Sequence, residues 1–153
     1  MVGSPKACKK SETLKDVAKH MAEFNIGSMP VLDEEKHVIG MITDRDVCLS
    51  LLKANGKPVS EIKVEDIMTN QVFSVLPEDD IETALRIMRM EQIGRLPVID
   101  KDKNLTGILS LNRIVHETHG SKEEAEIEYQ GKENVIKTLH SIALRNDSER
   151  LWV

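Results

Sequence analysis

Aromatic residues and cysteines are scarce in this chain of 153 residues. Phenylalanine, tyrosine and tryptophan together make up 3% of it, which leaves few side chains to stack on the bases of a single strand. The net charge of -5 also argues against binding to nucleic acid through clustered positive charge. Neither cysteine, Cys8 or Cys48, has another cysteine or a histidine at metal-ligand spacing. The sequence therefore predicts neither a nucleic-acid-binding protein nor a zinc site built on cysteine.

Long apolar runs are also absent. The apolar stretches, such as residues 38–42 with Gly40 inside, are far shorter than the ~20 residues needed to cross a bilayer. Residues 1–10 contain no apolar segment of the kind that opens a secretory signal. We therefore expect a cytoplasmic protein that does not enter a membrane. With 40% hydrophobic and 31% charged residues, its composition is that of an ordinary globular chain.

A repeat with a period of 67 residues organises the chain. Residues 14–47 align with residues 81–114 without a gap, and eight of the 34 pairs are identical. The identical pairs are Met21/Met88, Ile26/Ile93, Gly27/Gly94, Pro30/Pro97, Val31/Val98, Asp33/Asp100, Lys36/Lys103 and Gly40/Gly107. A copy of roughly 50 residues is too short to close a core alone, so we expect the two to pack together about a pseudo-twofold axis.

Each copy predicts the order strand, helix, strand, strand, helix, which is an α+β fold. The first helices are indicated by apolar residues at helical spacing. These are Leu14, Val17, Ala18 and Met21 in one copy, and Ile81, Ala84, Leu85 and Met88 in the other. Apolar runs split by a polar turn predict hairpins over residues 29–42 and 96–109. Residues 6–8 and 72–76 predict the leading strands, and Thr43 and Ser110 precede the second helices as caps.

These patterns divide the chain into four parts. The first repeat takes residues 1–55, a linker residues 56–66, the second repeat residues 67–119, and a C-terminal extension residues 120–153. The extension contains an apolar stripe that predicts a helical tail. Its members are Val135, Ile136, Leu139, Ile142 and Ala143. The sequence leaves open whether this tail docks on its own globule, on a second copy or on another protein.

Two motifs resemble those of a known family. Residues 26–33 (Ile-Gly-Ser-Met-Pro-Val-Leu-Asp) are followed by residues 40–46 (Gly-Met-Ile-Thr-Asp-Arg-Asp), and the pattern recurs at residues 93–100 and 107–110. Residues 66–69 (Asp-Ile-Met-Thr) are a typical opening of a second domain. Residues 6–117 thus resemble the paired cystathionine-β-synthase (CBS) domain, or Bateman module. The resemblance implies a regulatory module without catalysis that binds adenine nucleotides or related adenosyl ligands between its domains and often dimerises.

Residues 43–46 stand where a strand becomes a helix. The free N–H groups and the dipole of a helix start favour a phosphate, and the Asp46 carboxylate can accept both hydrogen bonds of a ribose diol. The alternative is that Thr43 and Asp46 only form a capping box. In the family that the chain resembles, this Gly-x-x-Thr/Ser-x-x-Asp pattern binds ribose and phosphate.

The resemblance carries further ligand contacts onto this chain. These are Met41, Gln71, Val72, Phe73, Ile93, Gly94, Arg95 and Pro97. In related modules an arginine at the place of Arg95 contacts phosphate, whereas a solvated edge residue is the alternative. We expect AMP, ADP or ATP as the ligand, with S-adenosylmethionine as a further candidate and no required cofactor. We also expect a homodimer and a regulated protein that the sequence does not identify.

The second copy departs from the first at the matching helix. Arg113 stands where the first copy has Asp46, and a guanidinium offers no acceptor to a ribose hydroxyl. The second cleft, formed with residues 4–6, Ile26 and Ser28, is therefore expected to hold no ordinary nucleoside, which predicts one ligand per chain. Both cysteines align with valines and are expected to be inert core thiols. A ligand-independent oligomerisation scaffold is the alternative function.

Overall fold

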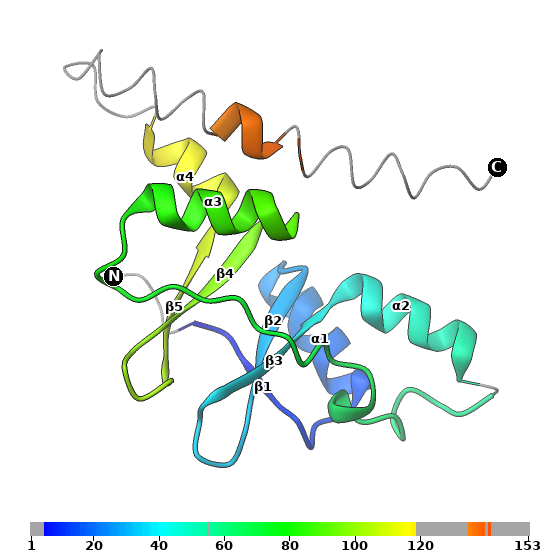
Figure 1. Cartoon of the computed structure of the whole chain (residues 1–153). Coiled ribbons are helices and arrows are strands. Elements are labelled where there is room, and N and C mark those ends of the chain that lie inside the picture. The colour runs from blue at the N-terminus through cyan, green and yellow to red at the C-terminus, as the bar shows by residue number, and fades with distance from the viewer. Residues whose placement is uncertain (1–4, 55, 119–134, 140, 142–153) are drawn as a thin grey trace, which may run out of the picture. The chain divides into compact units, whose positions relative to one another are not determined.

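The computed structural model describes residues 5–54, 56–118, 135–139 and 141 (Figure 1). The elements are β1 (Cys8–Lys9), α1 (Leu14–Phe24), β2 (Ser28–Leu32), β3 (Val38–Thr43), α2 (Asp44–Lys53), the 3-10 helix η1 (Val64–Asp66), α3 (Ile81–Glu91), β4 (Arg95–Ile99), β5 (Leu105–Ser110) and α4 (Leu111–Thr118). The elements α3, β4 and β5 begin 67 residues after α1, β2 and β3 and have the same lengths. The predicted repeat and its α+β order are therefore confirmed.

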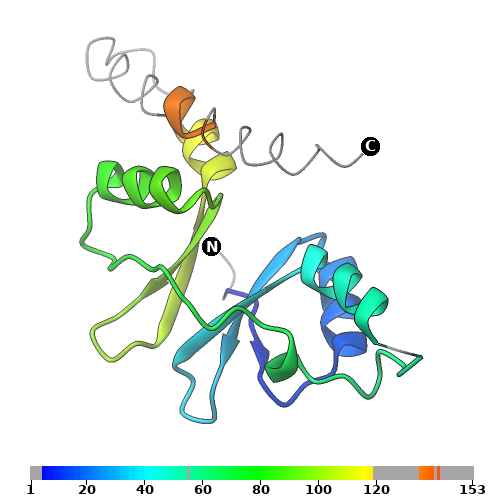
Figure 2. The same ribbon diagram turned by 45° about the vertical axis from the view of Figure 1, so that its right-hand side comes forward.

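The chain divides into two compact units. Unit 1 comprises Met1–Val72 with Ile99–Thr106, and unit 2 comprises Phe73–Val98 with Gly107–Val153. In unit 1, β2 lies between β1, to which it is parallel, and β3, to which it is antiparallel. The helices α1 and α2 lie side by side beside this sheet (Figures 1 and 2). In unit 2, β4 and β5 form a two-stranded sheet.

Both leading strands are shorter than the sequence predicts. β1 begins at Cys8, not at residue 6, and the strand expected at residues 72–76 is reduced to one parallel bridge between Val75 and Val98. In unit 2, the next hydrogen bond of a parallel ladder before the Val75–Val98 bridge would run from the N–H of residue 97 to the carbonyl of residue 73. In unit 1, the matching bond before the Cys8–Val31 pair would run from the N–H of residue 30 to the carbonyl of residue 6. Residues 30 and 97 are both prolines, which have no N–H. The repeated proline therefore ends both ladders at the same register.

The core of unit 1 is completed by the segment that follows α2. Leu14 and Val64 are fully buried, and the N–H of Leu14 donates to the carbonyl of Ile62 at 2.9 Å. The N–H of Val64 donates to the carbonyl of Glu12 at 2.9 Å. Residues 62–69, which include the motif typical of a second domain, thus pack on the first unit. Ala18, predicted on the buried face of α1, is exposed.

The core of unit 2 is completed by the C-terminal segment. Val135 belongs to this core, and the Thr138 hydroxyl donates to the carbonyl of Leu85 at 3.5 Å. The Ser141 hydroxyl donates to the carbonyl of Arg89 at 3.0 Å. The described part of the tail therefore docks on its own globule.

Some apolar positions of unit 2 face solvent. Ile81, predicted on the buried face of α3, is 47% exposed, whereas Ala84, Leu85 and Met88 are buried as expected. In the tail, Ile136 and Leu139 are exposed, and the predicted apolar residues Ile142 and Ala143 lie outside the described residues. Every helix of the described part of the chain is too short or too polar to cross a membrane.

The two cysteines differ in their surroundings. Cys8 is 1% exposed, and burial, assisted by the nearby charge of Glu12, raises the pKa of its thiol to about 12. This confirms an inert core thiol. Cys48 is exposed, so the same prediction is wrong for it. The reason is that Cys48 lies on the outer side of α2, whose only buried residue is Ser50, whereas its counterpart Val115 packs against the core of unit 2.

Candidate ligand-binding site

Thr43 ends β3 and caps α2. Its hydroxyl donates to Oδ2 of Asp46 at 2.7 Å, and its N–H donates to the same oxygen at 2.9 Å. In return, the N–H of Asp46 donates to Oγ1 of Thr43 at 3.1 Å. The capping box that the sequence analysis held as the alternative is therefore present, and it uses only one carboxylate oxygen of Asp46.

The first N–H groups of α2 all have acceptors. The N–H of Asp44 donates to the carbonyl of Gly27 at 3.0 Å, that of Arg45 to Oδ1 of Asp44 at 2.8 Å, and that of Asp46 to Thr43. The expectation that these three N–H groups are free is therefore wrong, and phosphate binding at this helix start stays a prediction. The Gly27 carbonyl, the Asp44 carboxylate and the Thr43 hydroxyl each accept one of these bonds, and the carboxylates of the first turn also oppose an anion electrostatically.

The oxygen Oδ1 of Asp46 has no hydrogen-bond partner among the residues that the structure describes. The Asp46 side chain is half-buried, and the capping box fixes its orientation. A carboxylate oxygen carries two lone pairs, so Oδ1 can accept from the hydroxyls of a diol while Oδ2 keeps the cap. This arrangement favours a neutral polyol group such as ribose over a phosphate.

Met41 connects β3 to the segment that carries two more predicted residues. The N–H of Met41 donates to the carbonyl of Thr69 at 3.0 Å, and the N–H of Thr69 donates back at 2.9 Å. Close approach at this point requires Gly40, because a Cβ there would lie 3.0 Å from the Thr69 carbonyl oxygen. Gln71, which is exposed, and Val72, which is half-buried, follow directly along the chain.

The other five predicted residues belong to unit 2. Phe73 and Ile93 are half-buried and pack against its core. Gly94 accepts from the N–H of Leu111 at 2.9 Å and so holds the start of α4, as Gly27 holds the start of α2. Arg95 begins β4 and is exposed. Pro97 is fully buried, and its carbonyl accepts from Val75 at 3.1 Å, so its visible role is structural.

The start of α4 has the opposite charge from that of α2. The N–H of Arg113 donates to the Ser110 hydroxyl at 3.3 Å, and the first turn contains no acidic residue. Only half of a capping box is therefore formed. Of the residues predicted for the second cleft, Ile26 is half-buried and Ser28 is 8% exposed. Ser4 lies outside the described residues.

A pocket in unit 2 lies between α3 and the C-terminal segment. It has a volume of about 300 Å³ and is lined by α3 residues, including Arg86 and Arg89, and by Thr138. None of the ten predicted ligand contacts lines this pocket.

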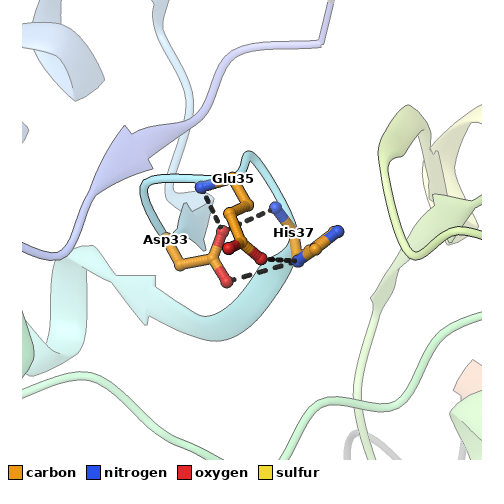
Figure 3. Close-up of side chains that lie close together, drawn as sticks. All are labelled: Asp33, Glu35 and His37. Atoms are coloured by element: carbon orange, nitrogen blue, oxygen red, sulfur yellow. Dashed lines mark hydrogen bonds and ion pairs between the residues drawn. The ribbon is translucent and has the colours of Figure 1, made fainter.

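A cluster that the sequence analysis missed lies in the turn between β2 and β3 (Figure 3). The Nδ1 atom of His37 is 3.4 Å from Oδ2 of Asp33 and 3.5 Å from Oε2 of Glu35. In the sequence, residues 33–37 indicate only a polar turn between two apolar runs. The Asp-x-Glu-x-His spacing could have indicated the cluster, because a tight turn places these three side chains on one side.

The model of one protein family, the CBS domain, matches residues 1–53 and 64–120. The chain belongs to the CBS domain family. The two matched stretches are CBS repeats in tandem and make the chain a Bateman module, in agreement with the internal repeat. The family resemblance drawn from the sequence is thereby confirmed.

Similar proteins support the same assignment. The CBS domain-containing protein YhcV of Bacillus subtilis is 34% identical over 116 residues, which cover 72% of this chain and 80% of YhcV. The uncharacterized protein MK0525 of Methanopyrus kandleri is 32% identical over 115 residues. That match covers 75% of this chain, which spans only 56% of the length of MK0525. The crystal structure of CBSX2 in complex with AMP has a TM-score of 0.65 and 28% identity, and covers 75% of this chain and 87% of CBSX2.

Proposed function

We propose that this Bateman module is a regulatory sensor that binds one adenosyl ligand per chain and has no catalytic activity of its own. The observation that carries the proposal is the state of Asp46, with one oxygen held by the cap and the other left to accept from a ribose. The similarity to CBSX2, which was solved in complex with AMP, supports an adenosyl ligand.

In this proposal, the parts of the ligand are divided among the predicted residues. Asp46 accepts from the ribose, and the apolar side chains of Met41, Val72, Phe73 and Ile93 contact the base. Because the N–H groups at the start of α2 are already used, a phosphate needs another partner. Arg95 is exposed and carries a planar fork of donors that suits this task.

The acidic start of α2 sets a preference among adenosyl ligands. Asp44 and Asp46 place two carboxylates in the first turn, and they repel negative charge close to the ribose. AMP and S-adenosylmethionine are therefore expected to bind more tightly than ATP, which carries the most negative charge of the three. The Arg113 position offers no ribose acceptor, which supports one site per chain.

Regulation requires the ligand to favour one conformation or assembly over another. We propose that the chain forms homodimers and passes this bias to its copy or to a regulated protein. An exposed apolar surface on α2 supports self-association, since such patches commonly mark interaction surfaces. Its leucines, Leu49, Leu51 and Leu52, are 40%, 53% and 82% exposed.

Titration of the full chain with AMP, ATP and S-adenosylmethionine tests the function. Calorimetry is expected to give one site per chain, with the weakest affinity for ATP. Thermal unfolding at a ligand concentration of about 100 times Kd should show about 2.7 kcal/mol of stabilisation. Two equal adenine-nucleotide sites would contradict the assignment of Asp46, and no shift with any of the three ligands would contradict the sensor function.

A ligand-independent oligomerisation scaffold is the second candidate. It is favoured by the complete capping box, which gives Thr43 and Asp46 a structural role, and by the exposed leucines of α2. Sedimentation of the chain with and without AMP separates the two. The sensor predicts an assembly or a shape that changes with AMP, whereas the scaffold predicts the same dimer in both conditions.

A further inference from the structure

The turn between β2 and β3 gathers three potential metal ligands at its tip. Asp33 orients the turn, because its Oδ1 accepts from the N–H groups of Glu35 and His37, each at 2.9 Å. Its other oxygen, Oδ2, points toward His37 (Figure 3). One ligand atom from each of Asp33, Glu35 and His37 lies within 4.8 Å of the others.

The distances are those of ion pairs and also match those between the ligands of a metal ion. The Nδ1 atom of His37 lies 3.4 Å from Asp33 and 3.5 Å from Glu35, beyond the usual limit of about 3.2 Å for an N–H···O bond. Ligands at about 2.0–2.2 Å from a tetrahedral zinc ion are separated by about 3.3–3.5 Å. The histidine nitrogen therefore stands at the spacing of a tetrahedral edge from each carboxylate oxygen, and the three atoms all lie within 4.8 Å of one another.

The side chains can close on an ion. Asp33 and His37 are half-buried, with side-chain exposures of 24% and 32%, whereas Glu35 is 79% exposed. One imidazole and two carboxylates form a donor set of the kind that holds zinc and similar transition ions, with a fourth position for water.

The matching turn of the second repeat provides a comparison within the same molecule. Asp100 accepts from the N–H groups of Asp102 and Asn104, and Lys36 and Lys103 both have positive φ angles, so the two turns share one conformation. Asn104 stands where the first turn has His37, and its amide donates to both Asp100 oxygens. The second turn therefore has the same scaffold but lacks the imidazole.

We propose that Asp33, Glu35 and His37 form a binding site for one divalent transition-metal ion of the zinc class. The site lies in unit 1 and is separate from the residues assigned to the adenosyl ligand. A bound ion would lock the tip of the hairpin, whose N–H at Val38 also donates to the carbonyl of Lys103 at 3.3 Å.

Calorimetric titration of the metal-free full chain with Zn²⁺ tests the proposal. The Cys48→Ser chain serves as the starting protein, so that the exposed thiol does not bind the ion. One Zn²⁺ ion per chain is expected. His37→Asn, which gives the first turn the residue of the second, should weaken binding at least about tenfold, since even changes around metal ligands cost about 10–100-fold. Its unfolding without metal should match that of the starting protein.

His20→Asn is the matched control, because His20 faces a single carboxylate, Glu12, at 3.8 Å. This variant should bind Zn²⁺ like the starting protein. As a gain of function, the double change Asp102→Glu and Asn104→His should add a second ion. Unchanged Zn²⁺ affinity in His37→Asn, or no binding by the starting protein at millimolar Zn²⁺, would overturn the site.

Discussion

The starts of α2 and α4 make the same backbone hydrogen bond but carry side chains of different charge. In both, the first helical N–H donates to the carbonyl of a glycine that follows an isoleucine. The N–H of Asp44 donates to Gly27 at 3.0 Å, and that of Leu111 donates to Gly94 at 2.9 Å. The side chains then diverge, since α2 begins with two carboxylates, whereas α4 has no acid and carries Arg113. The comparison teaches that the same backbone contact is kept in both repeats while the charge of the side chains beside it changes.

A second difference lies in what completes each core. Residues 59–69 follow α2 and cover the start of α1, where the N–H of Leu14 meets Ile62. The C-terminal segment follows α4 and covers the middle and end of α3 instead, at Leu85 and Arg89. This explains why Leu14 is buried while its counterpart Ile81 is 47% exposed. The first helix of each repeat is therefore covered at its start in unit 1 and at its middle and end in unit 2.

The glycine pair at positions 40 and 107 gives the largest expected difference between the repeats. A Cβ at position 40 would lie 2.8 Å from Sδ of Met68 and 3.0 Å from the Thr69 carbonyl, whereas one at position 107 would come no closer than 3.6 Å to Val98. Gly40→Ala should therefore reduce the free energy of unfolding by about 1–3 kcal/mol. Gly107→Ala should stay within about 0.5 kcal/mol of the original protein.

Urea denaturation of both variants measures these changes. An equal loss in the two variants would show that the close approach of residues 68–69 to β3 does not distinguish the repeats.

The buried thiol of Cys8 predicts a smaller, pH-dependent difference. The folded state holds its proton up to a pKa of about 12, while an unfolded thiol ionises near 9.0. Below that value both states are neutral and the thiol has no effect. Above it, unfolding releases a proton, so stability falls by about 1.4 kcal/mol per pH unit for this one group.

Chemical denaturation at pH 8 and pH 10 measures the effect. Cys8→Val, which places the residue of position 75 at position 8, should lose less stability between the two pH values than the original protein. Cys48→Val is the control and should behave like the original. A loss between pH 8 and pH 10 that is the same with and without the Cys8 thiol would contradict this account.

Much of the fold could be predicted from the sequence, because the repeat and the helical spacing of apolar residues indicate which residues of each short segment are buried. The length of the leading strands did not follow, since it depends on the missing N–H of a proline in the partner strand. Ala18 and Ile81 were placed wrongly because the segments that cover α1 and α3 come from elsewhere in the chain. Cys48 was misplaced because alignment with Val115 assumed equal packing of α2 and α4.

The hydrogen bonds at the start of α2 could not be predicted from the sequence, and the ligand contacts stay a prediction. The sequence indicated Thr43 and Asp46, but not that Asp44 would satisfy the N–H of Arg45. The cluster around His37 was missed because its three side chains become neighbours only when the turn folds Asp33 back onto its own backbone.

The most direct test of the account is AMP binding by two capping-box variants of unit 1. Thr13 and Asp16 cap α1 with the same reciprocal bonds as Thr43 and Asp46, including a hydroxyl-to-carboxylate distance of 2.6 Å. Asp16→Ala and Asp46→Ala should each lose about 0.5–2 kcal/mol of stability as caps. Only Asp46→Ala should also weaken AMP, by about 10–100-fold, because a hydrogen bond to a charged group is lost. Equal AMP affinity in the two variants would show that Asp46 is a cap and nothing more.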